Sequence, residues 1–181
     1  MTKTKPTYRE TTLWILSIEE IEGIIFNNVI QVKSYIFRNY KNMDFNISSL
    51  IHMHKLVSWN LFEEAWQYRK HNVTMWDFQP IDYYKVIVEM KKLEDDISYR
   101  YNIVKTVEEK KEFLAYIMWK ILWIHPFFDY NGRVTRLFWE LFLLKNKLAL
   151  SKFYNTSRND FVKAMKKATQ IWEFDDTINL I

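Results

Sequence analysis

Residues 113–144 read FLAYIMWKILWIHPFFDYNGRVTRLFWELFLL, which is two apolar runs separated by a short stretch rich in polar residues. In the first run apolar side chains recur at a spacing of four, as in Phe113, Ile117 and Ile121, and this spacing predicts a helix with a broad apolar face. The second run predicts another helix, which begins near Arg133. The polar stretch is therefore expected to be a loop between two buried helices.

Both ends of the first helix are marked in the sequence. Thr106 is followed three residues later by Glu109, which is the pattern of a capping box, so the helix is expected to begin there. Pro126 disfavours α-helical geometry in the residue before it, so the helix is expected to end at Ile124. His125 then begins the loop.

The rest of the chain favours a mainly α fold. Only two glycines and three prolines occur in 181 residues, a composition that helices tolerate better than hairpin-rich sheets do. Apolar periodicity predicts further helices at about residues 11–26, 28–40, 47–57, 59–69, 81–98 and 157–172. The alternating residues 71–79, next to Pro80, predict a single short β-hairpin, which we call the flap. No linker or internal repeat is visible, so residues 1–181 are expected to form one domain.

Composition argues against several classes of protein. Hydrophobic residues make up 49% and aromatic residues 18% of the chain, which is typical of a folded core rather than a disordered segment. The longest apolar runs are far shorter than the roughly 18 residues that span a bilayer, so no membrane span is expected. The net charge of +4 is spread along the chain without a dense basic run, so nucleic acid is not expected as a partner. With no cysteine and no signal-peptide pattern, the chain is expected to stay in a reducing cytoplasm.

Residues 125–136 combine the side chains that a site for a metal-bound polyphosphate requires. His125 can act as a base near neutral pH, and Asp129 carries the hard oxygen ligands that Mg²⁺ prefers. Arg133 and Arg136 are three residues apart on the second helix, so both can contact the same phosphate chain.

Asn131 and Gly132 form a turn that leads into a helix N-terminus, where unpaired amides and the helix dipole favour a phosphate group. The whole stretch, HPFFDYNGR followed by Arg136, resembles the signature HPFx(D/E)GNGRxxR of the Fic family. A weaker similarity covers residues 65–69, AWQYR, which resemble the AGxYR segment ahead of the flap in that family.

The resemblance implies a Fic fold with about six to eight helices and a short β-hairpin flap near the active-site loop. It also implies a protein adenylyltransferase that moves AMP from ATP, its substrate, to a Ser, Thr or Tyr hydroxyl, with Mg²⁺ as cofactor. The related phosphotransferase branch typically has Lys in place of Gly132, so AMP transfer is favoured over phosphate transfer. The expected partner is a target protein that bears a hydroxyl, and self-modification and a homo-oligomer are further options. The expected location is a bacterial cytoplasm, with secretion as an effector left open.

The signature also implies a role for each site residue. His125 would accept the proton of the target hydroxyl, and Asp129 would bind the metal ion. The other roles are phosphate contacts and an apolar anchor: Asn131 orients the α-phosphate, the Gly132 amide donates to the anion hole, Arg133 and Arg136 hold the β- and γ-phosphates, and Phe127 anchors the loop.

Tyr130 stands where the family usually has Gly. A bulky residue there could crowd the phosphates or resist a positive φ, if the loop needs one. Two functions therefore remain: an active AMP-transferring enzyme in which Tyr130 points outward, and a catalytically impaired Fic-like module that binds a nucleotide or a protein.

Residues 17–23 read SIEEIEG and resemble the (S/T)xxxE(G/N) inhibitory motif that many Fic proteins carry ahead of the core. The resemblance implies an inhibitory helix at residues 11–26, in which Glu22 pairs with Arg136 and keeps the γ-phosphate of ATP out of its productive position. The motif is imperfect, because the fourth residue before Glu22 is Ile18 and the serine lies one residue earlier. The alternative is that Glu22 is only a solvated carboxylate on a helix surface.

The remaining histidines are interpreted as structural residues. His52 and His54 are two residues apart, so on a helix they face different ways and cannot share a metal ion as an i, i+4 pair would. Both are interpreted as packing or surface residues, and His71 as a polar loop residue.

Overall fold

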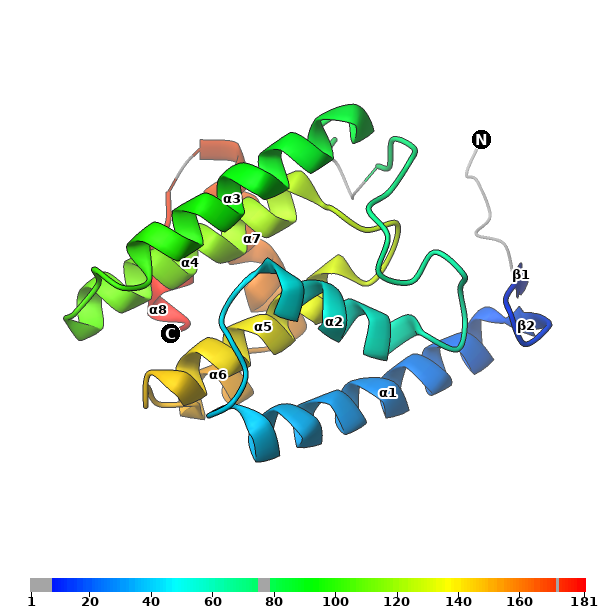
Figure 1. Ribbon diagram of the computed structural model, residues 1–181, viewed down its shortest axis with the longest axis horizontal. Helices are drawn as coiled ribbons and strands as arrows, with labels where there is room; N and C mark the ends of the chain where they lie inside the picture. The colour runs from blue at the N-terminus through cyan, green and yellow to red at the C-terminus, as the bar shows by residue number, and fades with distance from the viewer. Residues whose placement is uncertain (1–7, 75–78, 172) are drawn as a thin grey trace.

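The computed structural model describes residues 8–74, 79–171 and 173–181, and it is mainly helical, as predicted (Figure 1). Its elements, in chain order, are β1 (Tyr8–Glu10), β2 (Ile15–Ser17), α1 (Ile18–Asn39), α2 (Ile47–Ser58), a 3₁₀ turn η1 (Tyr83–Lys85), α3 (Val86–Arg100), α4 (Val107–Ile124), α5 (Asn131–Lys145), α6 (Ser151–Asn155), α7 (Arg158–Ile171) and α8 (Asp175–Asn179). Among the described residues, no helix has both the length and the apolar character needed to cross a membrane.

Helices α4 and α5 form the centre of the fold, with α1 and α2 packed on α5 and α3 packed on α4 (Figure 1). Large side chains that are fully buried come from both central helices, among them Phe113 of α4 and Phe138, Trp139 and Phe142 of α5. The loop that joins α4 to α5 is therefore fixed at both ends in the core.

Helix α1 is one continuous element from Ile18, whereas two helices at 11–26 and 28–40 were expected, and that prediction was wrong. The start is set by a capping box, because the Ser17 hydroxyl accepts from the Glu20 amide while the Glu20 carboxylate accepts from the Ser17 amide. The helix continues through the expected break at Asn27, and the buried side chain of the next residue, Asn28, donates to the Val57 carbonyl at 2.9 Å.

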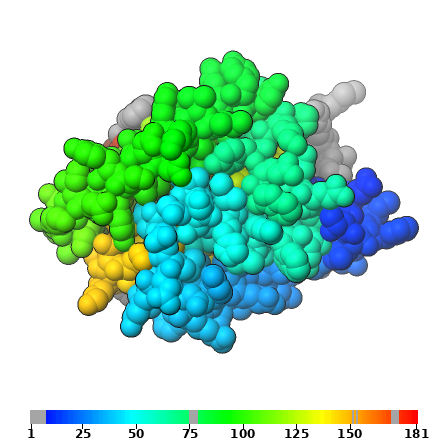
Figure 2. Space-filling view, in the orientation of Figure 1, coloured from blue at the N-terminus to red at the C-terminus, as the bar shows by residue number. Residues whose placement is uncertain are grey.

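The two-stranded sheet lies at the N-terminus, and the sequence did not predict it. Strands β1 and β2 are antiparallel, with Tyr8 opposite Ser17 and Glu10 opposite Ile15. The hairpin that they form is attached to the segment after α2, because the Thr12 amide donates to the Leu61 carbonyl at 2.9 Å. In the space-filling view the hairpin lies beside that segment at one end of the molecule (Figure 2).

Two other predictions near the site differ from the structure. Residues 59–69 form consecutive turns rather than a helix, and Trp66 has a φ of 81°, which no α-helix accommodates. For the predicted flap, residues 71–74 and 79 contain no strand, and residues 75–78 lie outside the described part of the chain.

Candidate functional site

The loop between α4 and α5 turns through two residues in the left-handed region. His125, the C-cap of α4, has φ 51° and ψ 62°, and Tyr130, the N-cap of α5, has φ 59° and ψ 12°. A non-glycine residue in this region costs roughly 1–2 kcal/mol, so the surrounding contacts must hold the conformation.

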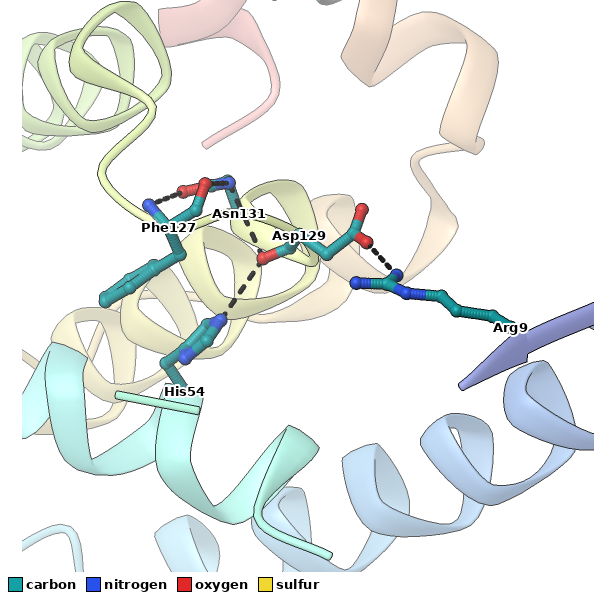
Figure 3. Close-up of polar contacts among 5 residues, drawn as sticks. All are labelled: Arg9, His54, Phe127, Asp129 and Asn131. Atoms are coloured by element: carbon teal, nitrogen blue, oxygen red, sulfur yellow. Dashed lines mark hydrogen bonds and ion pairs between the residues drawn. The ribbon is translucent and has the colours of Figure 1, made fainter. Parts of the chain in front are cut away.

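Asn131 closes the loop with its side chain. Its Oδ1 accepts from the Phe127 amide at 2.9 Å and its Nδ2 donates to the Phe127 carbonyl at 2.8 Å (Figure 3). The amide group is buried, so both contacts are shielded from water. Although Asn131 was expected to orient a phosphate, its side chain here fixes the loop backbone.

His54 supports the same loop from α2. Its ring stacks on Phe127 with centroids 3.8 Å apart, and its Nε2 lies 3.2 Å from the Asp129 carbonyl (Figure 3). Because the Trp66 amide donates to Nδ1 at 3.0 Å, the proton must be on Nε2, which donates to Asp129. From the sequence, His54 was expected only to pack in the core or to lie on the surface. Its spacing of four from the apolar Leu50 was a sign in the sequence that it faces the core.

Arg69 holds the start of the loop and was not predicted as a site residue. Its Nε donates to the His125 carbonyl at 2.8 Å, and its Nη2 donates to the Ile124 carbonyl at 3.2 Å. These carbonyls belong to the end of α4, where they have no partner within the helix and where a cation is favoured by the helix dipole. The similarity of residues 65–69 to a family segment was the only sequence signal for this side chain.

His125 is neutral at physiological pH. Burial, and next the charge of Arg69, lower its pKa from 6.5 to about 4, and a contact with the Leu122 backbone opposes them in part. A neutral imidazole has a lone pair that can accept a proton, so His125 is in the form that a general base requires.

His54 and His125 together make stability depend on pH. Burial lowers the pKa of each from 6.5 to about 4, so between these values the unfolded chain binds protons that the folded chain does not. The stabilisation is therefore present above pH 6.5 and is lost as the pH falls toward 4. We expect a loss of about 1–2 kcal/mol for each histidine between about pH 7.5 and about pH 5, measured by urea denaturation.

A matched pair of variants separates the contribution of His54. His54→Gln is expected to lower the overall stability but to remove one histidine's share of the pH-dependent loss. His52, which is exposed on the same helix, provides the control His52→Gln, in which the loss should persist. If His54→Gln loses as much stability at low pH as the parent does, burial of the neutral ring is not the cause.

Asp129 is the acidic residue of the loop, and its side chain is 45% exposed. It pairs with Arg9 of β1, whose Nη1 lies 2.5 Å from Oδ2 (Figure 3). The described residues contain no cluster of three or more metal-ligating side chains. A lone exposed carboxylate beside a phosphate site suits Mg²⁺, which is usually held by one or two carboxylates together with substrate phosphates and water.

The two arginines of α5 have different partners. Arg133 forms an ion pair with Glu22, and Arg136 donates to the Thr156 carbonyl at 3.4 Å. The expected pairing of Glu22 with Arg136 was therefore wrong. Glu22 reaches Arg133 in the first turn of α5, whereas Arg136 lies three residues further along and contacts the segment after α6.

The N-terminus of α5 suits an anion. Its N-cap, Tyr130, makes no side-chain capping hydrogen bond, so the first amides are not satisfied by the cap. Apart from its chain neighbours and the backbone of its own helix, nothing lies within 4 Å of the position that a Cβ would occupy at Gly132. Open space next to these amides, with Arg133 one residue further on, is the geometry that binds phosphate at helix N-termini.

Comparison with known proteins gives a family match and a set of similar folds. A family model described as "Fic/DOC family" matches residues 44–143, whereas no curated protein matches the sequence. The chain is similar in fold to the BepC effector of Bartonella tribocorum with bound AMPPNP, at 17% identity and a TM-score of 0.77 over 99% of this chain and 92% of that one. The N-terminal Fic domain of an effector from Bartonella sp. AR 15-3 has 17% identity and a TM-score of 0.79, over 99% of this chain and 85% of that one. An ADP-bound Fic domain from Bartonella quintana has 17% identity and a TM-score of 0.74, over 99% of this chain and 91% of that one.

Proposed function

The chain belongs to the Fic/DOC family, and on that basis we propose that it transfers AMP from ATP to a Ser, Thr or Tyr hydroxyl of a target protein. The observation that carries the proposal is the loop itself, in which a neutral His125 precedes an uncapped helix N-terminus with Arg133 in its first turn. Similar folds that bind AMPPNP and ADP support a nucleotide as the ligand.

In the proposed reaction the target oxygen attacks the α-phosphorus, the bond from that phosphorus to the bridging oxygen breaks, and pyrophosphate leaves. His125 accepts the proton of the attacking hydroxyl. The amides at the start of α5 and the side chains of Arg133 and Arg136 hold the phosphates and their developing charge. A divalent cation held by Asp129 would supply further charge neutralisation. We place the reaction in a bacterial cytoplasm.

The test uses ATP labelled at one phosphorus at a time. The Glu22→Gly protein is incubated with a bacterial lysate, Mg²⁺ and ATP radiolabelled at either the α- or the γ-position. Label from the α-position alone is expected on protein, and mass spectrometry of the labelled band should identify an AMP adduct. Label from the γ-position would mean phosphate transfer, and no label from either would leave the impaired binding module as the better function.

Tyr130 can be tested separately, because its backbone already has the positive φ that a glycine would adopt easily. Its ring lies 6.3 Å from that of Phe62, with the Arg133 guanidinium 5.3 Å away. Because Tyr130 already has the left-handed backbone of the loop, its conformation favours the active enzyme over the impaired module. In the Glu22→Gly background, Tyr130→Gly is expected to change the rate of AMP transfer by less than about threefold, which is under about 0.7 kcal/mol. A large gain of activity in Tyr130→Gly would instead identify the parent as the impaired form.

A further inference from the structure

Arg9 occupies a cation-binding cage at the entrance to the site. Its guanidinium pairs with the Asp129 carboxylate at 2.5 Å and lies 4.1 Å from the centre of the Phe62 ring and 5.1 Å from that of Phe128. One carboxylate and two aromatic faces are the groups that hold a cation in proteins. The carboxylate is the one that would bind the divalent cation of the proposed reaction.

The backbone of the hairpin brings Arg9 to this position. Thr12 donates from its amide to the Leu61 carbonyl at 2.9 Å and from its hydroxyl to the Asn60 carbonyl at 3.0 Å. These contacts attach the turn of the hairpin to the chain immediately before Phe62, which is one wall of the cage. The Arg9 contact is therefore part of how the hairpin docks rather than an isolated surface ion pair.

The same stretch of chain carries Glu22, because β2 ends at Ser17 and α1 begins at the next residue. The Glu22 carboxylate forms an ion pair with the Arg133 guanidinium, and the Arg9 guanidinium forms an ion pair with the Asp129 carboxylate. A bound metal–phosphate group would use the same two residues, with its phosphate on Arg133 and its metal ion on Asp129. Without a bound nucleotide, residues 8–22 therefore supply the ion-pair partners of both Arg133 and Asp129.

We propose that Arg9 is a second inhibitory residue, which competes with the divalent cation for Asp129 while Glu22 competes with phosphate for Arg133. The proposal rests on the proposed function. Binding of the metal–nucleotide complex must displace both contacts, and the hairpin leaves its place on Leu61 when Arg9 is displaced. A partly exposed ion pair with two ring contacts contributes about three- to thirtyfold to such a competition.

The test measures nucleotide binding rather than transfer. Binding of AMPPNP is followed by calorimetry over a range of Mg²⁺ concentrations in the parent, in Arg9→Ala and in the control Arg38→Ala, which removes a charge from the exposed far end of α1. Arg9→Ala is expected to lower the Mg²⁺ concentration for half-maximal binding by about three- to thirtyfold. Arg38→Ala should behave like the parent. In an Asp129→Asn background, Arg9→Ala should have no such effect.

Two outcomes would overturn the proposal. If Arg9→Ala weakens AMPPNP binding both with Mg²⁺ and with a chelator, Arg9 is a phosphate ligand and not a competitor of the metal. If the Mg²⁺ dependence of Arg9→Ala equals that of the parent, Asp129 is not blocked by Arg9. The binding measurement needs no transfer of AMP. If the protein binds AMPPNP but labels no target, the proposed function is wrong, while the competition of Arg9 with Mg²⁺ is still decided by the binding data. Absence of AMPPNP binding in every variant would contradict both the proposed function and the inhibitory role of Arg9.

Hydrogen exchange provides an independent readout of the hairpin. In the parent, Mg²⁺ with AMPPNP is expected to speed amide exchange in residues 8–17, because the Thr12 contact with Leu61 is broken. In Arg9→Ala these amides should exchange faster than in the parent before any nucleotide is added. Unchanged exchange in the parent on binding would contradict displacement of the hairpin.

Discussion

His125→Ala is expected to reduce AMP transfer by about a hundredfold to ten-thousandfold, the range over which a positioned general base contributes to a rate. The imidazole is neutral because burial lowers its pKa to about 4, so at physiological pH nearly every molecule has the base form. The affinity for AMPPNP should change little, since the proposed role of His125 is at the target hydroxyl. Rates are measured with α-labelled ATP in the Glu22→Gly background, and binding by calorimetry.

The matched control is His71→Ala, which removes an imidazole from the cavity that Asp129 and Tyr130 line, without changing the loop between α4 and α5. This variant should retain most of the activity. A loop disturbed by the loss of His125 would show itself as lower thermal stability or weaker AMPPNP binding. Transfer at the parental rate in His125→Ala would mean that another group removes the proton.

The second large effect is expected from Glu22→Gly, which should raise the rate of AMP transfer by about tenfold or more, a change of at least about 1.4 kcal/mol. The carboxylate of Glu22 forms an ion pair with the guanidinium of Arg133. The variant therefore frees Arg133 to bind phosphate and removes a negative charge from a polyphosphate site. The measurement is the initial rate of self-modification or target modification with α-labelled ATP.

Glycine also weakens a helix, by roughly 1 kcal/mol relative to alanine, so the gain must be separated from loosening of α1. Glu19→Gly introduces the same flexibility at an exposed position in the first turn and should not activate. Glu22→Gln keeps the helix-forming side chain but removes the charge and should activate in part. Arg133→Ala should not activate, because it removes the phosphate ligand together with its inhibitor. Equal rates in the parent and Glu22→Gly would contradict an inhibitory role for Glu22.

Local sequence patterns were enough to predict the central helices and the loop between them. The capping box of Thr106 with Glu109 begins α4 as expected, and the helix ends at Ile124 before Pro126. Each of these signals acts through neighbours within a few residues, which is why it can be recognised without knowledge of the rest of the fold. The same holds for the residue types of the loop, whose spacing along one helix turn predicts a phosphate site.

The sequence was less informative where local preferences conflict or are weak. Residues 59–69 were expected to be helical, yet the segment turns so that the Trp66 amide reaches His54 and the Arg69 side chain reaches the end of α4. Tertiary hydrogen bonds to buried groups outweigh a modest helical preference. The hairpin of β1 and β2 is similarly defined by its contact with Leu61, far along the chain.

The sequence by itself determined which residues form the loop, that two buried helices hold it, and that a carboxylate at Glu22 lies ahead of it. Only the tertiary structure decided which arginine that carboxylate meets, and that Arg9 meets Asp129. These partners are 111 and 120 residues apart in the chain. Their pairing depends on how α1 lies along α5 and where the hairpin docks, which is set by the packing of whole elements against one core and not by any local pattern.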